Sequence, residues 1–307
     1  MKKALSLFIS ASLFLALTVE LRSQNSDRVY QFETFQLSNP ELIDVRTSGG
    51  SIQIEGSELD EVRVEMYVRY RGRYLAPSDT DLNDFDIRIE QVGNRVIAHA
   101  ERTTERGWRF WRDFESISFV VYTPSNTNVK ARTSGGSVSA ASLNGTIELR
   151  TSGGSISLEN LAGVIEARTS GGSLSMTEID GSLSARTSGG SIRLEQAVGE
   201  FDLRTSGGGM RFEEVSGKLA ARTSGGSIRA KMGSVEDLLD LRTSGGSITI
   251  EVPRGGYDLN LRGNRVRTEL INFSGNSERS RIEGSMDGGG PLIRARTSGG
   301  SVTLNYF

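Results

Sequence analysis

The stretch LRTSGGSI at residues 149–156 returns as ARTSGGSL at 167–174 and as ARTSGGSI at 185–192. The arginines of the regular copies follow one another at intervals of 18 residues, and the last interval is 20. These arginines are Arg132, Arg150, Arg168, Arg186, Arg204, Arg222 and Arg242. A short fixed period of this kind predicts a solenoid, in which each repeat forms one coil and stacks on its neighbours.

Apolar residues recur at fixed places around each arginine. In one coil they are Ile147, Leu149, Ile156 and Leu158, which alternate with polar residues on either side of the turn. This alternation predicts two short strands per coil, joined at a Ser-Gly-Gly-Ser corner. A glycine 13 residues after the arginine marks a second corner; these glycines are Gly145, Gly163, Gly181, Gly199 and Gly217. We therefore predict an all-β, single-stranded β-helix or β-solenoid with about 18 residues per coil, stacked at about 4.8 Å and right-handed.

The remaining sequence divides the chain into parts. Residues 1–23 have a basic start and an apolar run too short for a membrane span, which predicts a secretory signal cleaved before Gln24 or, alternatively, after Thr18. Residues 28–307 are expected to form one β-solenoid domain: N-terminal strands with an aromatic insert at 28–129, regular coils at 130–251, and degraded coils with a C-terminal coil at 252–307.

The outlying copies of the repeat lie near the two ends. Arg46 opens a copy 86 residues before Arg132, and alternating runs between them predict longer strands in a mixed-strand cap. A degraded copy surrounds Arg262, and Arg296 begins a clean copy 54 residues after Arg242.

The composition excludes several classes of protein. The 307 residues are 36% apolar and 24% charged with a net charge of −2, so nothing points to nucleic acid. No cysteine is present, which excludes disulfides and thiol catalysis. No second apolar run reaches membrane-spanning length, so an integral membrane protein is not expected. The oligomeric state does not follow from the sequence.

The order of these features resembles a known family. A first Ser-Gly-Gly turn, an insert closing on ISFVVYTPSNTNVKARTSGGSV, tandem turns and the ending GGGPLIRARTSGGSV are similar to the bacterial putative-adhesin domain family of unknown function, related to the head-GIN putative autotransporter adhesins. The resemblance implies an exported β-helix with no assigned enzymatic activity. The near-verbatim Arg-Thr-Ser-Gly-Gly-Ser departs from the looser turn usual in that family.

The repeated arginines are the first candidate ligand-binding residues. Because their neighbours one and three positions earlier are core residues, the seven side chains should point outward as a ladder. Acidic residues two positions earlier, Glu148, Glu166, Asp202 and Asp240, suggest ion pairs along the wall, while Lys130, Ser184 and Ala220 interrupt the acidic row. One interpretation is therefore structural pairing, and the other is binding of an extended polyanion through bidentate arginine contacts. The threonine after each arginine should point inward.

Aromatic residues form the second candidate surface. Trp108, Phe110 and Trp111 lie beside arginines in ERGWRFWRDF and can stack on sugars or lipids, or else cap the open end of the solenoid.

The candidate chemistry is sparse. His99 is the sole histidine and lies in an alternating run, the turns lack the aspartate of calcium-binding repeats, and we expect no catalytic residues, metal or cofactor. The sequence thus predicts an exported, non-enzymatic protein of the periplasm, cell surface or extracellular space, acting as an adhesin or envelope scaffold. Its partners would be acidic polysaccharide, lipopolysaccharide or a surface protein. The alternatives are a polysaccharide-active β-helix enzyme, an ice-binding protein and a purely structural envelope protein.

Overall fold

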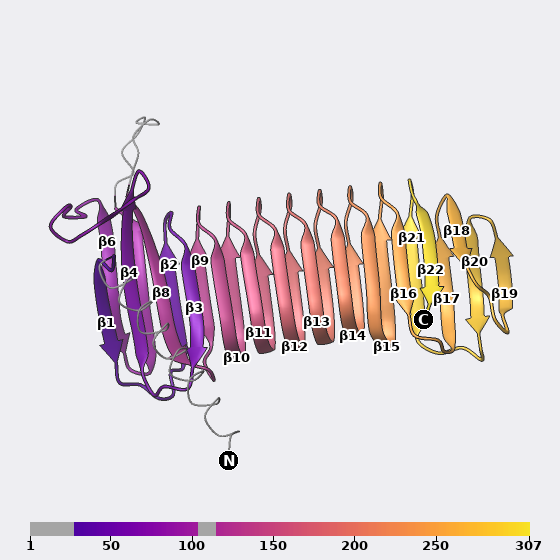
Figure 1. Cartoon of the computed structure of the whole chain (residues 1–307), viewed down its shortest axis with the longest axis horizontal. Coiled ribbons are helices and arrows are strands. Elements are labelled where there is room, and N and C mark those ends of the chain that lie inside the picture. The colour runs from indigo at the N-terminus through magenta and orange to yellow at the C-terminus, as the bar shows by residue number, and fades with distance from the viewer. Residues whose placement is uncertain (1–27, 104–114) are drawn as a thin grey trace, which may run out of the picture.

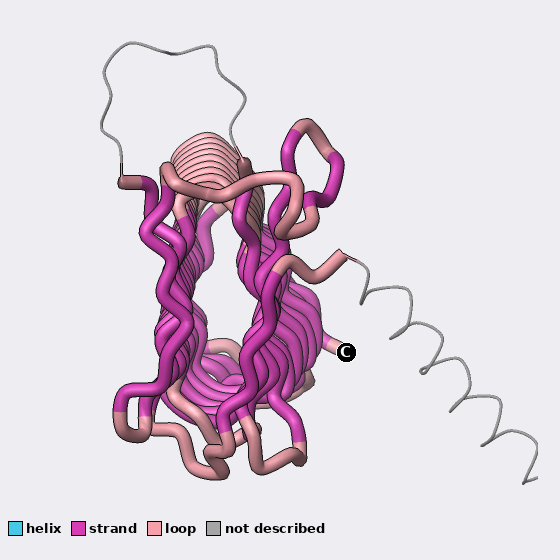
Figure 2. The backbone as a smooth tube through the Cα atoms, turned by 90° about the vertical axis from the view of Figure 1, so that its left-hand side faces the viewer, coloured by secondary structure: helices cyan, strands magenta, loops and turns pink. Residues whose placement is uncertain are grey.

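A computed structural model describes residues 28–103 and 115–307. The described chain winds into an elongated β-solenoid whose strands run across the long axis (Figure 1). Viewed along that axis, two walls of strands face each other and are joined by turns at both ends of a flattened coil (Figure 2). The predicted all-β solenoid is confirmed, and the proposed signal segment at residues 1–23 lies outside the described residues.

The regular coils each contain one long strand rather than the two short strands expected. The strand bends at the second corner because the parallel ladder continues around it, as the pairs Leu143 with Leu161 and Gly145 with Gly163 show. These strands pair in parallel with their neighbours, arginine opposite arginine. They are β10 (Val138–Thr151), β11 (Ile156–Arg168), β12 (Leu174–Arg186), β13 (Ile192–Arg204), β14 (Met210–Arg222) and β15 (Ile228–Thr243).

The two corners use glycine for different reasons. At the Ser-Gly-Gly-Ser corner the second glycine is needed for close approach, since a Cβ on Gly190 would lie 2.0 Å from the carbonyl oxygen of Gly172. At the second corner Gly199 has a φ of 137° and Gln196 a φ of 53°, both in the region that favours glycine. The bend therefore combines one left-handed residue with one glycine, and the sequence indicated only the glycine.

The core fills the space between the walls. Ile147, Leu149, Ile156 and Leu158 are all at most 2% exposed, as the alternation predicted. The equivalent positions of the neighbouring coils are buried as well, so each apolar side chain packs on the one above and below it. An aliphatic ladder thus supports the outward-facing residues of each wall.

The N-terminal part places distant segments side by side. The strands β2 (Leu42–Thr47) and β3 (Ile52–Ser57) pair with β9 (Val129–Thr133) and β10, so the Arg46 coil lies next to the Arg132 coil. On the other side, β7 (Arg95–Arg102) pairs in parallel with β2, and β8 (Ser116–Pro124) pairs in parallel with β3. Antiparallel strands then close this end, which confirms the mixed-strand cap: β1 (Gln31–Phe35), β4 (Val62–Tyr70), β5 (Arg73–Leu75) and β6 (Phe85–Val92).

The C-terminal coil does not lie at the end of the stack. Its first strand, β21 (Leu292–Thr297), lies between β15 and β17 (Tyr257–Arg262). Its second strand, β22 (Ser301–Tyr306), lies between β16 (Ile248–Val252) and β18 (Arg265–Thr268). A hairpin of β19 (Ser274–Glu278) and β20 (Arg281–Met286) pairs antiparallel with β17. Within the described ranges, no helix is long and apolar enough to span a membrane.

Candidate functional site

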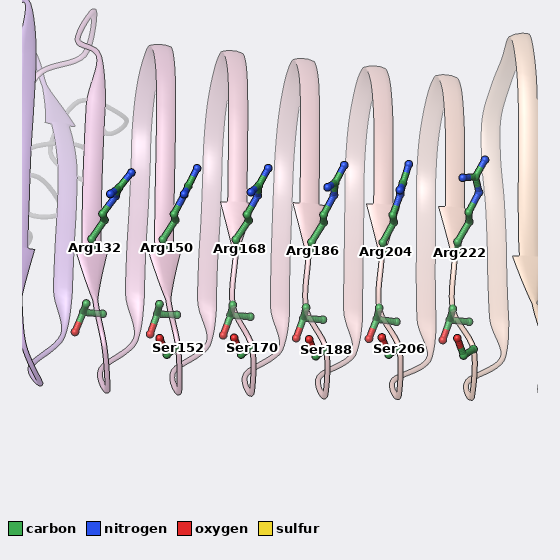
Figure 3. A pocket seen from close by; sticks show the side chains of 17 residues that line it. Arg132, Arg150, Ser152, Arg168, Ser170, Arg186, Ser188, Arg204, Ser206 and Arg222 are labelled. Atoms are coloured by element: carbon green, nitrogen blue, oxygen red, sulfur yellow. The ribbon is translucent and has the colours of Figure 1, made fainter.

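The seven candidate arginines lie on the wall that leads into the Ser-Gly-Gly-Ser turn. Their side chains are 39–45% exposed and point outward, because the residues before and after each arginine point into the core. Figure 3 shows six of them, Arg132 to Arg222, side by side on successive coils and leaning in the same direction. The wall thus presents one guanidinium group about every 4.8 Å.

The structure lengthens this ladder beyond the seven residues. Arg46 pairs in register with Arg132, Arg242 with Arg296, and Arg296 with Arg262. Ten arginines therefore form one file in the described part of the chain, about 43 Å long at the strand spacing of a sheet. The repeats at Arg46 and Arg296 were visible in the sequence, but their places in the stack depend on strand pairing.

A row of acidic side chains bridges the arginines. Glu148 lies 2.8 Å from Nη2 of Arg132 in the preceding coil and 2.8 Å from Nε of Arg150 in its own coil. Burial raises the pKa of Glu148, but the hydrogen bond from Arg132 and the charges of both arginines outweigh burial and hold the pKa below its ordinary value. The same bridging occurs at Glu166, Asp202 and Asp240.

The acidic row is too short to neutralise the ladder. The position two residues before the arginine is acidic at Asp44, Glu148, Glu166, Asp202 and Asp240, and it is Lys130, Ser184, Ala220, Arg294 or Asn260 in the other coils. Five carboxylates thus face ten arginines in these described coils. The excess positive charge is local, because the whole chain has a net charge of −2.

An open groove follows the ladder past the turns. Its volume is about 730 Å³, and its lining consists of the arginines, threonines and turn serines of consecutive coils from Arg132 to Ser224. Serines such as Ser152, Ser170 and Ser188 are exposed, and the described residues provide no hydrogen-bond partner for their hydroxyls. The groove therefore offers a row of cationic donors beside a row of free hydroxyls, with no carboxylate or histidine in its lining.

The threonines have a structural task. Thr187 is 7% exposed, and its hydroxyl donates to the carbonyl oxygen of Gly172 at 2.7 Å. The N–H of Gly190 donates to the same hydroxyl at 3.3 Å, so each threonine ties its turn to the preceding one. The neighbouring coils repeat this pair of bonds. The inward orientation is confirmed, and these threonines do not form the outward array that the ice-binding alternative needs.

The N-terminal end of the ladder carries the sole histidine. His99 is 6% exposed, pairs in register with Arg46, and places Nε2 3.4 Å from Oδ2 of Asp44. Burial raises the pKa of Asp44, yet the contacts with His99 and Arg46 together lower it below the ordinary value. His99 thus lies in the ion-pair row of the wall rather than in a cleft.

The other proposed site features lie elsewhere. Trp108, Phe110 and Trp111 fall outside the described residues. Further ion pairs lie on the opposite wall, where Glu195 and Glu213 pair with Arg193 and Arg211 of their own strands. In the described ranges no group of three or more histidine, aspartate or glutamate side chains is arranged to hold a metal ion.

Comparison with protein families agrees with this architecture. Residues 41–305 match the family model described as Toastrack DUF4097, which is almost the whole solenoid. The chain belongs to the Toastrack DUF4097 family. This membership confirms the resemblance to a putative-adhesin family and the solenoid fold, and the Toastrack description leaves the activity open.

Solved structures similar to this Toastrack chain share little sequence with it. A putative adhesin from Bacteroides fragilis is 12% identical, with a TM-score of 0.42, over 90% of this chain and 96% of the other. A putative lipid binding protein from Parabacteroides distasonis is 15% identical, with a TM-score of 0.45 and the same coverage of 90% and 96%. A putative cell adhesion protein from Clostridium sporogenes is 9% identical, with a TM-score of 0.25, over 90% and 99%. A search of curated proteins gives no match to this chain.

Proposed function

We propose that this Toastrack chain is an exported, non-enzymatic binding protein whose arginine groove holds a linear polyanion, such as an acidic polysaccharide or the phosphates of lipopolysaccharide. The observation that carries the proposal is the groove of about 730 Å³, in which the arginine ladder runs beside unpartnered serine hydroxyls. Guanidinium groups bind carboxylates and phosphates strongly because two parallel N–H donors match two oxygens.

Structural pairing alone does not account for the ladder. An exposed ion pair contributes only about 0–1 kcal/mol, and five of the ten coils offer no carboxylate two residues before the arginine. The arginine stems could cover the wall equally well with an uncharged end group. Because the carboxylates are shared between neighbouring arginines, the wall keeps an excess of positive charge, which supports an external anion as its partner.

The same surface suits an adhesin or envelope scaffold. A ladder about 43 Å long can contact many repeating units of a polymer at once, and weak contacts then add up to firm attachment. The apolar run within residues 1–23 supports export to the periplasm, cell surface or extracellular space. A surface protein with an acidic stripe is the other partner that this charge pattern supports.

The test is binding of polygalacturonate and of lipopolysaccharide to the chain at two salt concentrations, with neutral dextran as the uncharged polymer. We expect binding of an anionic polymer, weakened at the higher salt, and no binding of dextran. Replacing Arg168, Arg186 and Arg204 together by glutamine should weaken binding at least tenfold.

A matched control exists on the opposite wall. Arg193, Arg211 and Arg229 are exposed on consecutive coils there, and their replacement by glutamine removes the same charge. We expect this control to keep affinity within about threefold of the parent chain, which is under 1 kcal/mol. Equal losses in the two triple variants, or no binding of either anionic polymer by the parent chain, would contradict the proposal.

A further inference from the structure

The second corner of the solenoid carries carboxylates that have no partner. Each of the five consecutive coils between Arg150 and Arg242 contributes at least one exposed aspartate or glutamate at this corner. Among the described residues, no ion pair or hydrogen bond involves these side chains. Together they form an acidic corner, which consists of Glu159, Glu178, Asp180, Glu200, Glu214, Glu236 and Asp237.

Few basic side chains balance the acidic corner. Lys218 and Lys231 are the lysines of these coils, against seven unpaired carboxylates. Glu195 and Glu213 lie near the same corner but already pair with arginines of their own strands, so they add no free charge. The chain therefore has a local excess of negative charge here, as it has a local excess of positive charge at the arginine ladder.

The acidic corner and the arginine groove lie on different sides of the molecule. The Ser-Gly-Gly-Ser turns beside the groove follow one long edge of the solenoid, and the second corners follow the opposite edge (Figure 1). The two charged surfaces of one chain therefore cannot meet each other. They extend over nearly the same coils, since the groove runs from Arg132 to Ser224 and the acidic corner from Glu159 to Asp237.

The two surfaces also share one repeat. Parallel pairing continues around the second corner, as the pairs Glu159 with Thr177 and Asp180 with Val198 show. Each coil therefore advances the acidic corner and the arginine ladder by the same distance of about 4.8 Å. A second copy of the chain that lies alongside in parallel presents its carboxylates at the spacing of the guanidinium groups.

We propose that a second copy of this chain places its acidic corner in the arginine groove, so that copies associate side by side with their long axes parallel. The ladder has only five carboxylates for ten arginines, and the acidic corner supplies negative charge from five coils. The contact also covers Val164 and Val198, which are 59% and 54% exposed at the same corner. Each added copy brings one free groove and one free acidic corner, so the contact can repeat from copy to copy.

This inference goes beyond the proposed function, because its partner is the chain itself and not an external polyanion. Analytical ultracentrifugation over a range of protein concentrations tests it. We expect the mean mass to rise from that of one chain to that of two or more. The association should weaken at least about tenfold between about 0.05 M and about 0.5 M salt, because salt screens the contact.

Neutralising the acidic corner should prevent the association. The corner variant combines Glu178→Gln, Asp180→Asn, Glu200→Gln and Glu214→Gln, and it should associate at least about tenfold more weakly than the parent chain. Glutamine fits the bend, since Gln196 already occupies the position equivalent to Glu178 with a φ of 53°.

Mixing two variants separates a specific contact from a general effect of charge. The groove variant combines Arg168→Gln, Arg186→Gln and Arg204→Gln and keeps its acidic corner, whereas the corner variant keeps its groove. Each variant alone should stay monomeric where the parent chain associates. Their mixture should form a one-to-one complex, with an affinity within about threefold of the parent contact, because one intact groove and one intact corner remain.

Charge removed elsewhere provides the matched control. Glu58, Asp60, Glu90 and Glu101 are exposed in the N-terminal cap, and their replacement by the corresponding amides removes the same four charges. This control should associate within about threefold of the parent chain. A parent chain that stays monomeric, equal weakening in this control, or a mixture of groove and corner variants that does not associate would overturn the proposed contact.

The proposed function fails or stands separately. The corner variant keeps every arginine of the groove, so it should bind polygalacturonate at least as tightly as the parent chain. If the parent chain stays monomeric but binds polygalacturonate through its groove, only the self-association falls. If it associates through the acidic corner but binds no anionic polymer, only the proposed function falls.

Discussion

The Ser-Gly-Gly-Ser corner makes a sharp prediction about its two glycines. A Cβ added at Gly190 would lie 2.0 Å from the carbonyl oxygen of Gly172, whereas a Cβ at Gly189 would lie 3.3 Å from that of Gly171. Neither glycine has a positive φ, so the difference between them is one of space. Real Cβ atoms essentially never approach another atom closer than 3.0 Å, so the Gly190→Ala variant must push the two coils apart by at least about 1 Å at this corner.

That displacement would break the local ladder. The hydrogen bonds between this turn and its neighbour have donor–acceptor distances of 2.7–3.0 Å, as for Thr187 Oγ1 to Gly172 O and Gly189 N to Ser170 O. Lengthening these distances by about 1 Å breaks the hydrogen bonds. Two lost hydrogen bonds at about 1 kcal/mol each, with about 1–3 kcal/mol for overpacking, give about 3–5 kcal/mol for Gly190→Ala. Gly189→Ala should cost less than about 1 kcal/mol.

Hydrogen exchange measures this difference at the site. Opening of the backbone between Arg186 and Ile192 should become about 10² to 4 × 10³ times more frequent in Gly190→Ala, because each 1.4 kcal/mol changes the equilibrium tenfold. Exchange in Gly189→Ala should stay within about fivefold of the parent chain. Equal exchange in the two variants would refute close backbone approach as the reason for the second glycine.

Two further predictions concern the turn and the wall. Thr187→Val leaves the partly buried Gly172 carbonyl and Gly190 N–H without their partner and should destabilise the chain by about 1–3 kcal/mol. Thr187→Ser keeps the hydroxyl and should cost about 1 kcal/mol, and equal denaturation midpoints of the two variants in urea would contradict this assignment. Because Glu148 has a folded-state pKa below its ordinary 4.5, its ion pairs stabilise the fold above that pH and are lost as the pH falls through the folded-state pKa. The stability difference between the parent chain and Glu148→Gln should therefore shrink as the pH is lowered below 4.5, and a pH-independent difference would contradict it.

The position of each residue on its wall followed from local pattern. Alternation with period two identified Ile147, Leu149, Ile156 and Leu158 as core residues and placed each turn threonine inside and each arginine outside. The pairing of Glu148 and Glu166 with neighbouring arginines was predictable too, because residues two apart on a strand share a face. These features depend on a few consecutive residues and on a fixed repeat length.

The order of coils at the two ends depends on the tertiary structure. No local pattern states that Arg46 lies beside Arg132, or that Arg296 lies between Arg242 and Arg262, since identical turns can stack in any order. The stacking order of the coils depends on which strand edges are still unpaired when a later coil forms. The sequence separation does not prevent Arg46 and Arg132 from stacking, because the entropy cost of closing a loop of 86 residues is only slightly larger than that of a shorter loop.

The sequence by itself therefore determined the coil: its length, its corners, its core and the outward arginine. The tertiary structure decided how many arginines join one ladder and which carboxylate bridges which two arginines. The physical reason is that alternation and turn chemistry act within one coil. A carboxylate that bridges two arginines exists only between two coils, once the strands of both have paired.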